Sequence, residues 1–320
     1  MNNSTVLITG GTGLIGKALT KSLLDKGYRV IILSRNPDAP ANRSGESRST
    51  LALWDINRGT IDPAAIRDAT HIIHLAGANV GEKRWTQKRK KEIIDSRVRS
   101  GELLVKALKE IPNQVRTVIS SSAIGWYGPD PVNDPAFKGF SETDPSSNDF
   151  LGTTCKAWEE AIRPVVTMGK RLVTFRTGIV LSREGGAYPE YRKPVSFGLA
   201  TILGNGKQAV SWIHLDDLVR MYVKAVEDES LSGVYNAVAP TPVKNKDLIL
   251  AIAKLVKGWF YIPVYIPAAA LKLVLGEMSM EVLKSATVSC GKIHNKPFTF
   301  LYPSIEAAVR HLEDQKNQKD

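Results

Sequence analysis

Cysteine is scarce in this chain, which has only Cys155 and Cys290 among its 320 residues. Two cysteines cannot form the disulfide framework of a small secreted domain, and neither stands at a spacing typical of metal ligands. Both observations are typical of a protein from a reducing compartment. We therefore expect a cytoplasmic protein that holds no metal.

Long apolar runs are also missing. The most apolar late segment, residues 259–275, is interrupted by Pro263, Pro267 and Lys272, and it is too short to span a bilayer. At the other end, the first apolar run begins by Thr5, which leaves no room for a signal peptide. We expect neither a membrane partner nor secretion.

Acidic residues are in the minority, since 43 lysines and arginines outnumber 32 aspartates and glutamates and give a net charge of +11. The densest basic run, Lys88–Lys91, is followed by Ile93, Ile94 and Val98 at helical spacing, which indicates the solvated face of a helix. Aromatic residues do not interleave with basic ones as single-strand binding requires. Nucleic acid is not expected, and a basic surface that docks on an acidic partner is the weakest alternative.

Glycine, in contrast, is concentrated near the N-terminus in the stretch Thr5-Val-Leu-Ile-Thr-Gly-Gly-Thr-Gly-Leu-Ile-Gly16. Its apolar start predicts a buried strand, and apolar residues from position 14 onward recur at helical spacing. A strand that enters a helix through a glycine turn aims the free N–H groups of the helix at one point, where a pyrophosphate binds. The alternative is an ordinary turn that binds nothing. We predict dinucleotide contacts at Gly10, Gly11, Thr12, Gly13, Leu14, Ile15 and Gly16.

The second predicted strand, residues 29–33, ends without the acidic residue that holds the ribose 2′-hydroxyl in NAD-binding proteins. Ser34 and Arg35 stand there instead. The planar guanidinium of arginine suits a phosphate, and no carboxylate is present to repel one. This tip predicts NADP (NADPH), with Arg35 on the 2′-phosphate; the alternative is a surface arginine after a strand.

Strand-like and helical segments alternate up to residue 178, which predicts an α/β fold with a Rossmann-like doubly wound parallel sheet. Predicted strands lie at 51–54, 71–75, 114–120 and 171–176, and predicted helices at 87–109 and 150–166. Small residues after the strand at 71–75 let the backbone approach a ligand, which adds Ala76 and Gly77 to the cofactor set.

The regular alternation of strand-like and helical segments ends at residue 178. We assign residues 1–178 to an NADP-binding Rossmann domain, with an interwoven contribution from about 207–240, and residues 179–320 to a smaller C-terminal substrate lobe. Residues 178–206 are expected to form loops around one helix. A helix is predicted at 217–226, with Asp216 as its N-cap, followed by a strand at 233–237 and helices at 245–257, 267–275 and 304–313.

Motifs spread over nearly the whole chain resemble the extended short-chain dehydrogenase/reductase family, and more closely its atypical epimerase/dehydratase-like branch with a short extra C-terminal domain, here at about 245–312. They are Thr9-Gly-x-x-Gly-x-x-Gly16, Ser34-Arg35, Leu75-Ala-Gly77, Arg84-Trp85, Asp95-Ser-Arg97, Ser120-Ser-Ser122, Tyr127-Gly128, Trp158-Glu159, Arg176-Thr-Gly178 and Trp212-Ile-His214. The resemblance implies NADP contacts at the glycine turn, Ser34, Arg35, Leu75, Ala76, Glu92, Arg97 and Val180. Related folds also dimerise, so a homodimer is possible.

One family feature is absent. The usual chemistry needs a Tyr-x-x-x-Lys pair on the helix after the serine strand, in which the lysine lowers the tyrosine pKa. When the Trp158-Glu159 end of that helix is aligned, Leu151 falls at the tyrosine position and Cys155 at the lysine position. Three residues are candidate substitutes: Ser122, which matches the substrate-orienting serine, Tyr127, and Lys156. Lys156 is rotated about 100° around the helix from Cys155 and is expected to point elsewhere. Cys155 is interpreted as a buried, inert thiol.

These observations leave two main hypotheses. The first is an NADP-binding oxidoreductase or epimerase-like enzyme that acts on an unidentified small substrate. The second is a catalytically silent protein that binds NADPH as a sensor or regulator. Intact cofactor residues support both hypotheses, and the missing Tyr/Lys pair counts against the first.

Overall fold

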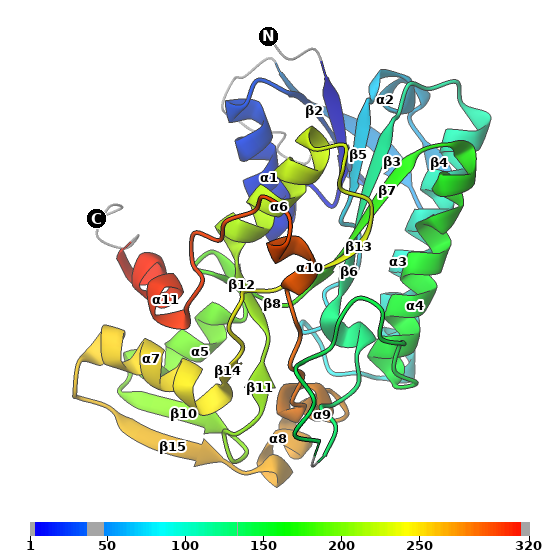
Figure 1. Cartoon of the computed structure of the whole chain (residues 1–320). Helices are drawn as coiled ribbons and strands as arrows, with labels where there is room; N and C mark the ends of the chain where they lie inside the picture. The colour runs from blue at the N-terminus through cyan, green and yellow to red at the C-terminus, as the bar shows by residue number, and fades with distance from the viewer. Residues whose placement is uncertain (1–3, 37–47, 133, 315–320) are drawn as a thin grey trace.

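A computed structural model describes residues 4–36, 48–132 and 134–314. Its centre is an eight-stranded sheet with the order β13-β7-β6-β5-β1-β2-β3-β4 (Figure 1). Neighbouring strands are parallel except for the short β4, which runs antiparallel to β3. The strands are β1 (Thr5–Thr9), β2 (Arg29–Ser34), β3 (Ser49–Asp55), β4 (Thr60–Ile61), β5 (His71–His74), β6 (Thr117–Ala123), β7 (Arg171–Thr177) and β13 (Gly233–Ala237).

Helices cover both faces of this sheet, as the buried residues of β1 show. Val6 and Ile8 pack in one core cluster with α1 (Leu14–Asp25) and α6 (Leu215–Glu227). Leu7, between them, packs in a second cluster with α2 (Pro63–Asp68), α3 (Gln87–Glu110) and α4 (Phe150–Ile162). Since successive side chains of a strand point to opposite faces, this division confirms the predicted doubly wound sheet.

The strand order reverses at β1, whose neighbours are β5 on one side and β2 on the other. The connections from β1 and from β5 therefore leave the sheet on opposite faces. A crevice forms outside the carboxyl ends of the strands at such a point, and it is where open α/β sheets bind their ligands. The glycine turn after β1 lies at this position.

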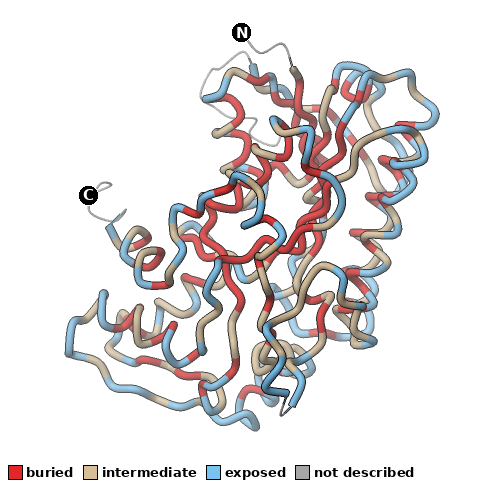
Figure 2. The backbone as a smooth tube through the Cα atoms, viewed as in Figure 1, coloured by how far each residue is buried: buried red, intermediate tan, exposed pale blue. Residues whose placement is uncertain are grey.

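The remaining elements form a smaller lobe below the main sheet in Figure 1, around a third core cluster. Figure 2 shows that buried residues are concentrated in the central sheet and are less frequent in this lobe. Its elements are β8 (Ile179–Ser182), β9 (Gly185–Gly186), α5 (Tyr188–Ser196), β10 (Leu199–Leu203), β11 (Ala209–Val210), β12 (Trp212–His214), β14 (Val243–Lys244), α7 (Asn245–Lys257), β15 (Ile262–Ile266), α8 (Ala268–Leu275), α9 (Met278–Leu283) and α11 (Ile305–Asp314). The exception is the short helix α10 (Gly291–His294), which packs against β13 in the first core cluster. Within the described residues, no helix has the length and apolarity needed to cross a membrane.

Three sequence predictions need correction. The helix predicted at 217–226 begins at Leu215, because His214 rather than Asp216 is its N-cap and accepts the Asp216 N–H. The helix predicted at 150–166 is α-helical only to Ile162 and continues as a 3₁₀ segment, Arg163–Met168, that carries a proline in its first turn. The segment 178–206, expected as loops around one helix, also contains β8, β9 and β10, each too short to show a period.

Candidate functional site

The turn after β1 is built so that side chains cannot enter it. Gly10 has φ = +70°, and a Cβ added there would lie 3.1 Å from the carbonyl of Leu75. A Cβ on Gly11 would lie 2.7 Å from Ile32 Cγ2, and one on Gly16 would lie 2.3 Å from the carbonyl oxygen of Gly10. Each position therefore requires glycine, as the motif predicts.

Helix α1 begins directly after this turn and has an open N-terminus. Its N-cap is Gly13, which has no side chain to accept a hydrogen bond from the first turn. The free N–H groups and the positive end of the helix dipole therefore remain available to an anion. This geometry fits the pyrophosphate of a dinucleotide.

A cleft of about 1800 Å³ opens above the turn. Its lining includes ten of the fifteen residues predicted to bind the cofactor: Gly10, Gly11, Thr12, Gly13, Ser34, Arg35, Leu75, Ala76, Gly77 and Glu92. The other five are Leu14, Ile15, Gly16, Arg97 and Val180, which are not among its lining residues. Leu14, Ile15 and Val180 pack against the core, and Arg97 is buried.

Arg97 supports the cleft from below. Its guanidinium donates hydrogen bonds to the carbonyl oxygens of Ala78 and Ile93, both at 3.0 Å, and lies 4.8 Å from the ring centre of Trp158. A Cβ on Gly77 would lie 3.1 Å from the Arg97 guanidinium carbon. Arg97 therefore fixes the path of the 77–78 backbone along the cleft wall.

The tip of β2 presents its side chains to the same cleft. Ser34 Oγ donates to the carbonyl oxygen of Asn36 at 3.0 Å and accepts its N–H at 3.1 Å, which closes a small turn. Arg35 lies in that turn and is exposed on the cleft wall. The nearest strand tip carries Asp55, but its carboxylate accepts the N–H groups of Asn57 and Arg58. The tip of β2 itself thus offers a guanidinium and no carboxylate.

Thr9 and His74, which sequence reasoning did not assign to the site, join the ends of β1 and β5. Thr9 Oγ1 accepts hydrogen bonds from the N–H groups of Leu75 and Ala76, both at 3.1 Å, and lies 2.8 Å from His74 Nδ1. Since this hydroxyl accepts twice, its own proton goes to His74 Nδ1, which requires a neutral ring. Burial lowers the pKa of His74 to about 4, which keeps the ring neutral.

Helix α4 carries neither a tyrosine nor a lysine where the family places that pair, and Ser122 and Tyr127 beside it are buried and are not among the residues that line the cleft. A Cβ on Gly125 would lie 3.0 Å from the Cβ of Leu151, so the leucine packs closely on the segment after β6. Cys155 is buried, and burial raises the pKa of its thiol to about 12. This thiol is therefore neutral and unreactive at physiological pH, as the sequence indicates.

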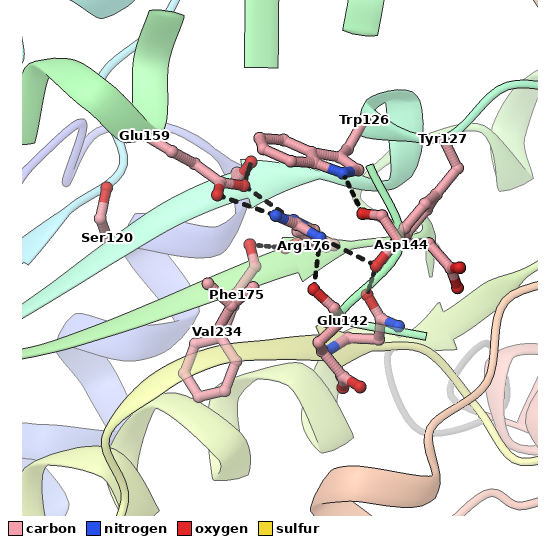
Figure 3. Close-up of polar contacts among 12 residues, drawn as sticks. Ser120, Trp126, Tyr127, Glu142, Asp144, Glu159, Phe175, Arg176 and Val234 are labelled. Atoms are coloured by element: carbon pink, nitrogen blue, oxygen red, sulfur yellow. Dashed lines mark hydrogen bonds and ion pairs between the residues drawn. The ribbon is translucent and has the colours of Figure 1, made fainter. Parts of the chain in front are cut away.

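A buried polar network lies beside these residues, centred on Arg176 (Figure 3). Its guanidinium donates to both carboxylate oxygens of Glu159, at 2.9 and 3.0 Å, and to the Tyr127 hydroxyl at 3.1 Å. It also lies flat over Trp126, with 3.6 Å from its central carbon to the ring centre. A bidentate, stacked arginine of this kind fixes its partners in one geometry.

The two candidate catalytic residues both belong to this network. Ser122 Oγ donates to Glu159 Oε1 at 2.7 Å. The Tyr127 hydroxyl donates to Asn236 Oδ1 at 2.7 Å, and burial raises its pKa to about 12. Tyr127 is fully buried and stacks on Phe140. Of the two, Ser122 is the one whose hydroxyl contacts an acid–base group, since Glu159 is a carboxylate.

Among the described residues, one group of side chains has ligand atoms close enough together for a metal ion. The ligand atoms of His214, Asp216 and His311 all lie within 4.8 Å of one another. However, His214 Nδ1 accepts the Asp216 N–H as the cap of α6, at 3.1 Å. This arrangement serves the start of the helix, and we assign no metal to it.

Comparison with known proteins agrees with this geometry. The model of the NAD dependent epimerase/dehydratase family matches residues 6–237, and a domain of unknown function, DUF1731, matches residues 266–312. An epimerase family protein of Mycobacterium bovis is 36% identical over 283 residues, which cover 88% of each chain. One of Bacillus subtilis is 33% identical, over 96% of this chain and 97% of that protein. The crystal structure of a human epimerase family protein with NADPH superposes with a TM-score of 0.83 at 27% identity, over 97% of this chain and 99% of that one.

Proposed function

Because this chain belongs to the NAD-dependent epimerase/dehydratase family, as its motifs indicated, we propose that it binds NADPH and exchanges a hydride with a small substrate at a secondary alcohol or carbonyl. The observation that carries this proposal is the cleft over the glycine turn, with an open helix N-terminus at one end and Arg35 at the other. The human relative with NADPH supports the same choice of cofactor.

The preference for NADPH over NADH rests on the tip of β2. Arg35 is exposed on the cleft wall, and Ser34 is tied into the turn that presents it. A guanidinium forms charge-assisted hydrogen bonds to a 2′-phosphate, which NADH lacks.

Arg35→Ala tests this preference. We expect NADPH affinity to fall about 10- to 100-fold, since a hydrogen bond to a charged group is lost, while NADH affinity stays the same. Fluorescence titration of both cofactors measures the change, with Arg67→Ala as an exposed arginine outside the cleft. Equal affinity of the unmutated protein for NADH and NADPH would exclude the role of Arg35.

Proton transfer in this proposal uses Ser122 and Glu159. For an alcohol substrate, the oxidised cofactor NADP⁺ would accept the hydride at its nicotinamide ring, and the NADPH so formed would return it to the carbonyl. Ser122 Oγ, which already donates to Glu159, takes the proton of the substrate hydroxyl as it passes its own proton to the carboxylate. On the return step both protons move back, which is the sequence an epimerase needs. Arg176 holds the Glu159 carboxylate in one position through two hydrogen bonds.

A panel of secondary alcohols and carbonyl compounds, followed by the absorbance of NADPH, tests this chemistry. In Ser122→Ala we expect turnover to fall at least about 100-fold while NADPH affinity is unchanged, because the proton relay is broken. Ser120→Ala is the matched control, since its hydroxyl contacts a backbone carbonyl and not Glu159. Full activity of Ser122→Ala would remove the serine from the mechanism.

A second candidate function is favoured by the packing of α4. Leu151 and Cys155 occupy the positions of the missing tyrosine and lysine, and the Tyr127 hydroxyl is hydrogen-bonded to Asn236 inside the protein. A protein of this kind could bind NADPH tightly and report its presence without turnover. Tight binding with no oxidation across the panel, and capture of a partner only when NADPH is present, would support the sensor over the enzyme.

A further inference from the structure

The smaller lobe has a sheet face that no described element covers completely. Strands β10 and β15 pair in parallel, with Leu199 beside Ile262 and Leu203 beside Ile266. The alternate residues Ala200 and Ile202 point into the core of the lobe and are buried. Since side chains alternate between faces, Leu199, Thr201, Leu203, Ile262, Val264 and Ile266 share the opposite face. All of these except Thr201 are aliphatic; Leu199 and Ile262 are exposed, and the others are half-buried.

Two aromatic side chains extend this face at the turn between α7 and β15. Trp259 is 83% exposed and Phe260 is 87% exposed, directly after Gly258 with φ = +62°. At the other end of β15, Leu273 and Val274 of α8 are also exposed. In Figure 1 these segments follow one another along the lower edge of the molecule. Exposed apolar side chains that recur along neighbouring segments in this way mark a candidate binding face.

The charge of the chain segment that carries β15 and the aromatic turn has a single sign. Between Asp247 and Glu277 the chain has no acidic residue, while Lys254, Lys257 and Lys272 are all present. Lys254 Nζ lies 5.6 Å from the ring centre of Trp259, so one cation sits directly at the aromatic turn. A lysine rim around exposed tryptophan and aliphatic residues is complementary to a surface that is apolar inside and anionic outside.

The free edge of β15 argues against a second copy of this chain as the partner. The N–H of Ile262 and the carbonyl of Ile266 bond to the β10 side. Residue 263, which alternates with them and faces the free edge, is a proline and has no N–H for an added strand. Two such faces would also bring like-charged lysines together.

We propose that this aliphatic and aromatic face docks the protein on anionic lipid bilayers as a peripheral protein. Trp259, Phe260 and the β15 side chains enter the boundary between headgroups and acyl chains, and the three lysines contact lipid phosphates. No helix spans the bilayer in this arrangement. The proposal departs from the sequence-based expectation of no membrane partner, which considered only a spanning segment.

Vesicle flotation of the full-length protein tests the proposal. We expect binding to vesicles of phosphatidylcholine mixed with phosphatidylglycerol, weaker binding to phosphatidylcholine alone, and weaker binding in high salt. In the double variant Trp259→Ser, Phe260→Ser the bound fraction falls at least about tenfold, because two exposed aromatic side chains no longer enter the bilayer. The matched control is Leu53→Ser, Val132→Ser, which removes two exposed apolar residues elsewhere.

NADPH affinity and thermal unfolding of both double variants are measured in parallel, since the replaced side chains are exposed and the fold should be unchanged. No binding of the unmutated protein to either vesicle, or equal loss in the control variant, would overturn the proposal. A dimer in sedimentation analysis that dissociates in Trp259→Ser, Phe260→Ser would assign this face to a second copy instead.

Discussion

The cofactor end and the proton-transfer end of the site differ in how their polar groups are used. At the cofactor end, the N-terminus of α1 has no capping side chain, and Arg35 is exposed on the cleft wall. At the proton-transfer end, the Arg176 guanidinium, the Glu159 carboxylate and the hydroxyls of Ser122 and Tyr127 all have partners within the protein. The polar groups of the cofactor end are open to a ligand, whereas those of the proton-transfer end already have hydrogen-bond partners within the protein.

The two ends also differ in the sequence separation of their residues. The glycine turn and the start of α1 lie within seven consecutive residues, 10–16, although the distant residues Ile32 and Leu75 also limit the turn to glycine. The Arg176 network joins residues from β6, α4, β7, β13 and the segment after β6, so it exists only in the folded protein. Local geometry is well suited to recognise a common cofactor, and a network of distant residues can change with each substrate.

Removing the glycine at the end of the turn should have the largest effect, and only on the cofactor end. In Gly16→Ala the new Cβ would lie 2.3 Å from the Gly10 carbonyl oxygen and 2.5 Å from Gly11 Cα, and backbone atoms cannot move aside easily. We expect NADPH affinity to fall at least about 100-fold, as measured by fluorescence titration. Gly81→Ala, whose Cβ has no neighbour closer than 3.7 Å, is the control and should bind normally.

If Gly16→Ala binds NADPH with normal affinity, the turn does not hold the pyrophosphate. The cofactor end would then have to be placed elsewhere in the cleft. A urea titration of the same variant separates loss of binding from loss of the fold.

Breaking the buried ion pair should act only on the other end. Arg176→Met leaves the Glu159 carboxylate without its bidentate partner, and we expect the free energy of unfolding to fall by about 3–5 kcal/mol. Urea unfolding measures this change, and NADPH affinity should stay the same. The exposed pair Lys26–Glu227 is the control, since Lys26→Met should cost less than about 1 kcal/mol.

The double variant Arg176→Met, Glu159→Gln sharpens this test. Since the glutamine carries no charge to leave unpaired, the double variant should lose less stability than the sum of the two single variants. Additive losses would mean that the two side chains contribute independently.

The sequence predicts the fold well because strand and helix periods are local patterns, and the observed sheet agrees with them. The glycine turn and the Ser34-Arg35 tip are local patterns too, and both lie on the cleft wall, where their contacts with a cofactor stay a prediction. Short strands such as β8 and β10 were missed because two to five residues show no period.

For the proton-transfer end, the sequence predicted only that the usual Tyr/Lys pair is missing, because Leu151 and Cys155 stand at its positions. The contact between Glu159 and Arg176 could not be predicted, since the two residues are seventeen positions apart and no sequence pattern joins them. Thr9 and His74 were missed in the same way, because they are 65 residues apart and meet only when β1 and β5 pair. Their one local signal is that each ends a strand whose tip lies at the cofactor crevice.

Acid should lower the stability of the fold by a smaller amount, through His74 at the end of β5. Its pKa is about 4 in the folded protein and about 6.5 when unfolded, so the unfolded chain takes up the proton first. The stability that the neutral ring contributes is therefore complete above pH 6.5 and is lost as the pH falls to 4, by up to about 3 kcal/mol. Urea unfolding at several pH values between 7 and 4 measures the loss.

His71 and His214 titrate in the same direction, with burial lowering their pKa values to about 4 and about 3, so the contribution of His74 must be isolated by a variant. His74→Gln keeps an acceptor for the Thr9 hydroxyl and cannot be protonated in this range. Its stability should fall less steeply with acid than that of the unmutated protein. At pH 5 the folded ring is still neutral, so NADPH affinity should be unchanged there although stability has already decreased. Identical pH profiles for the two proteins would mean that His74 is not held neutral by burial.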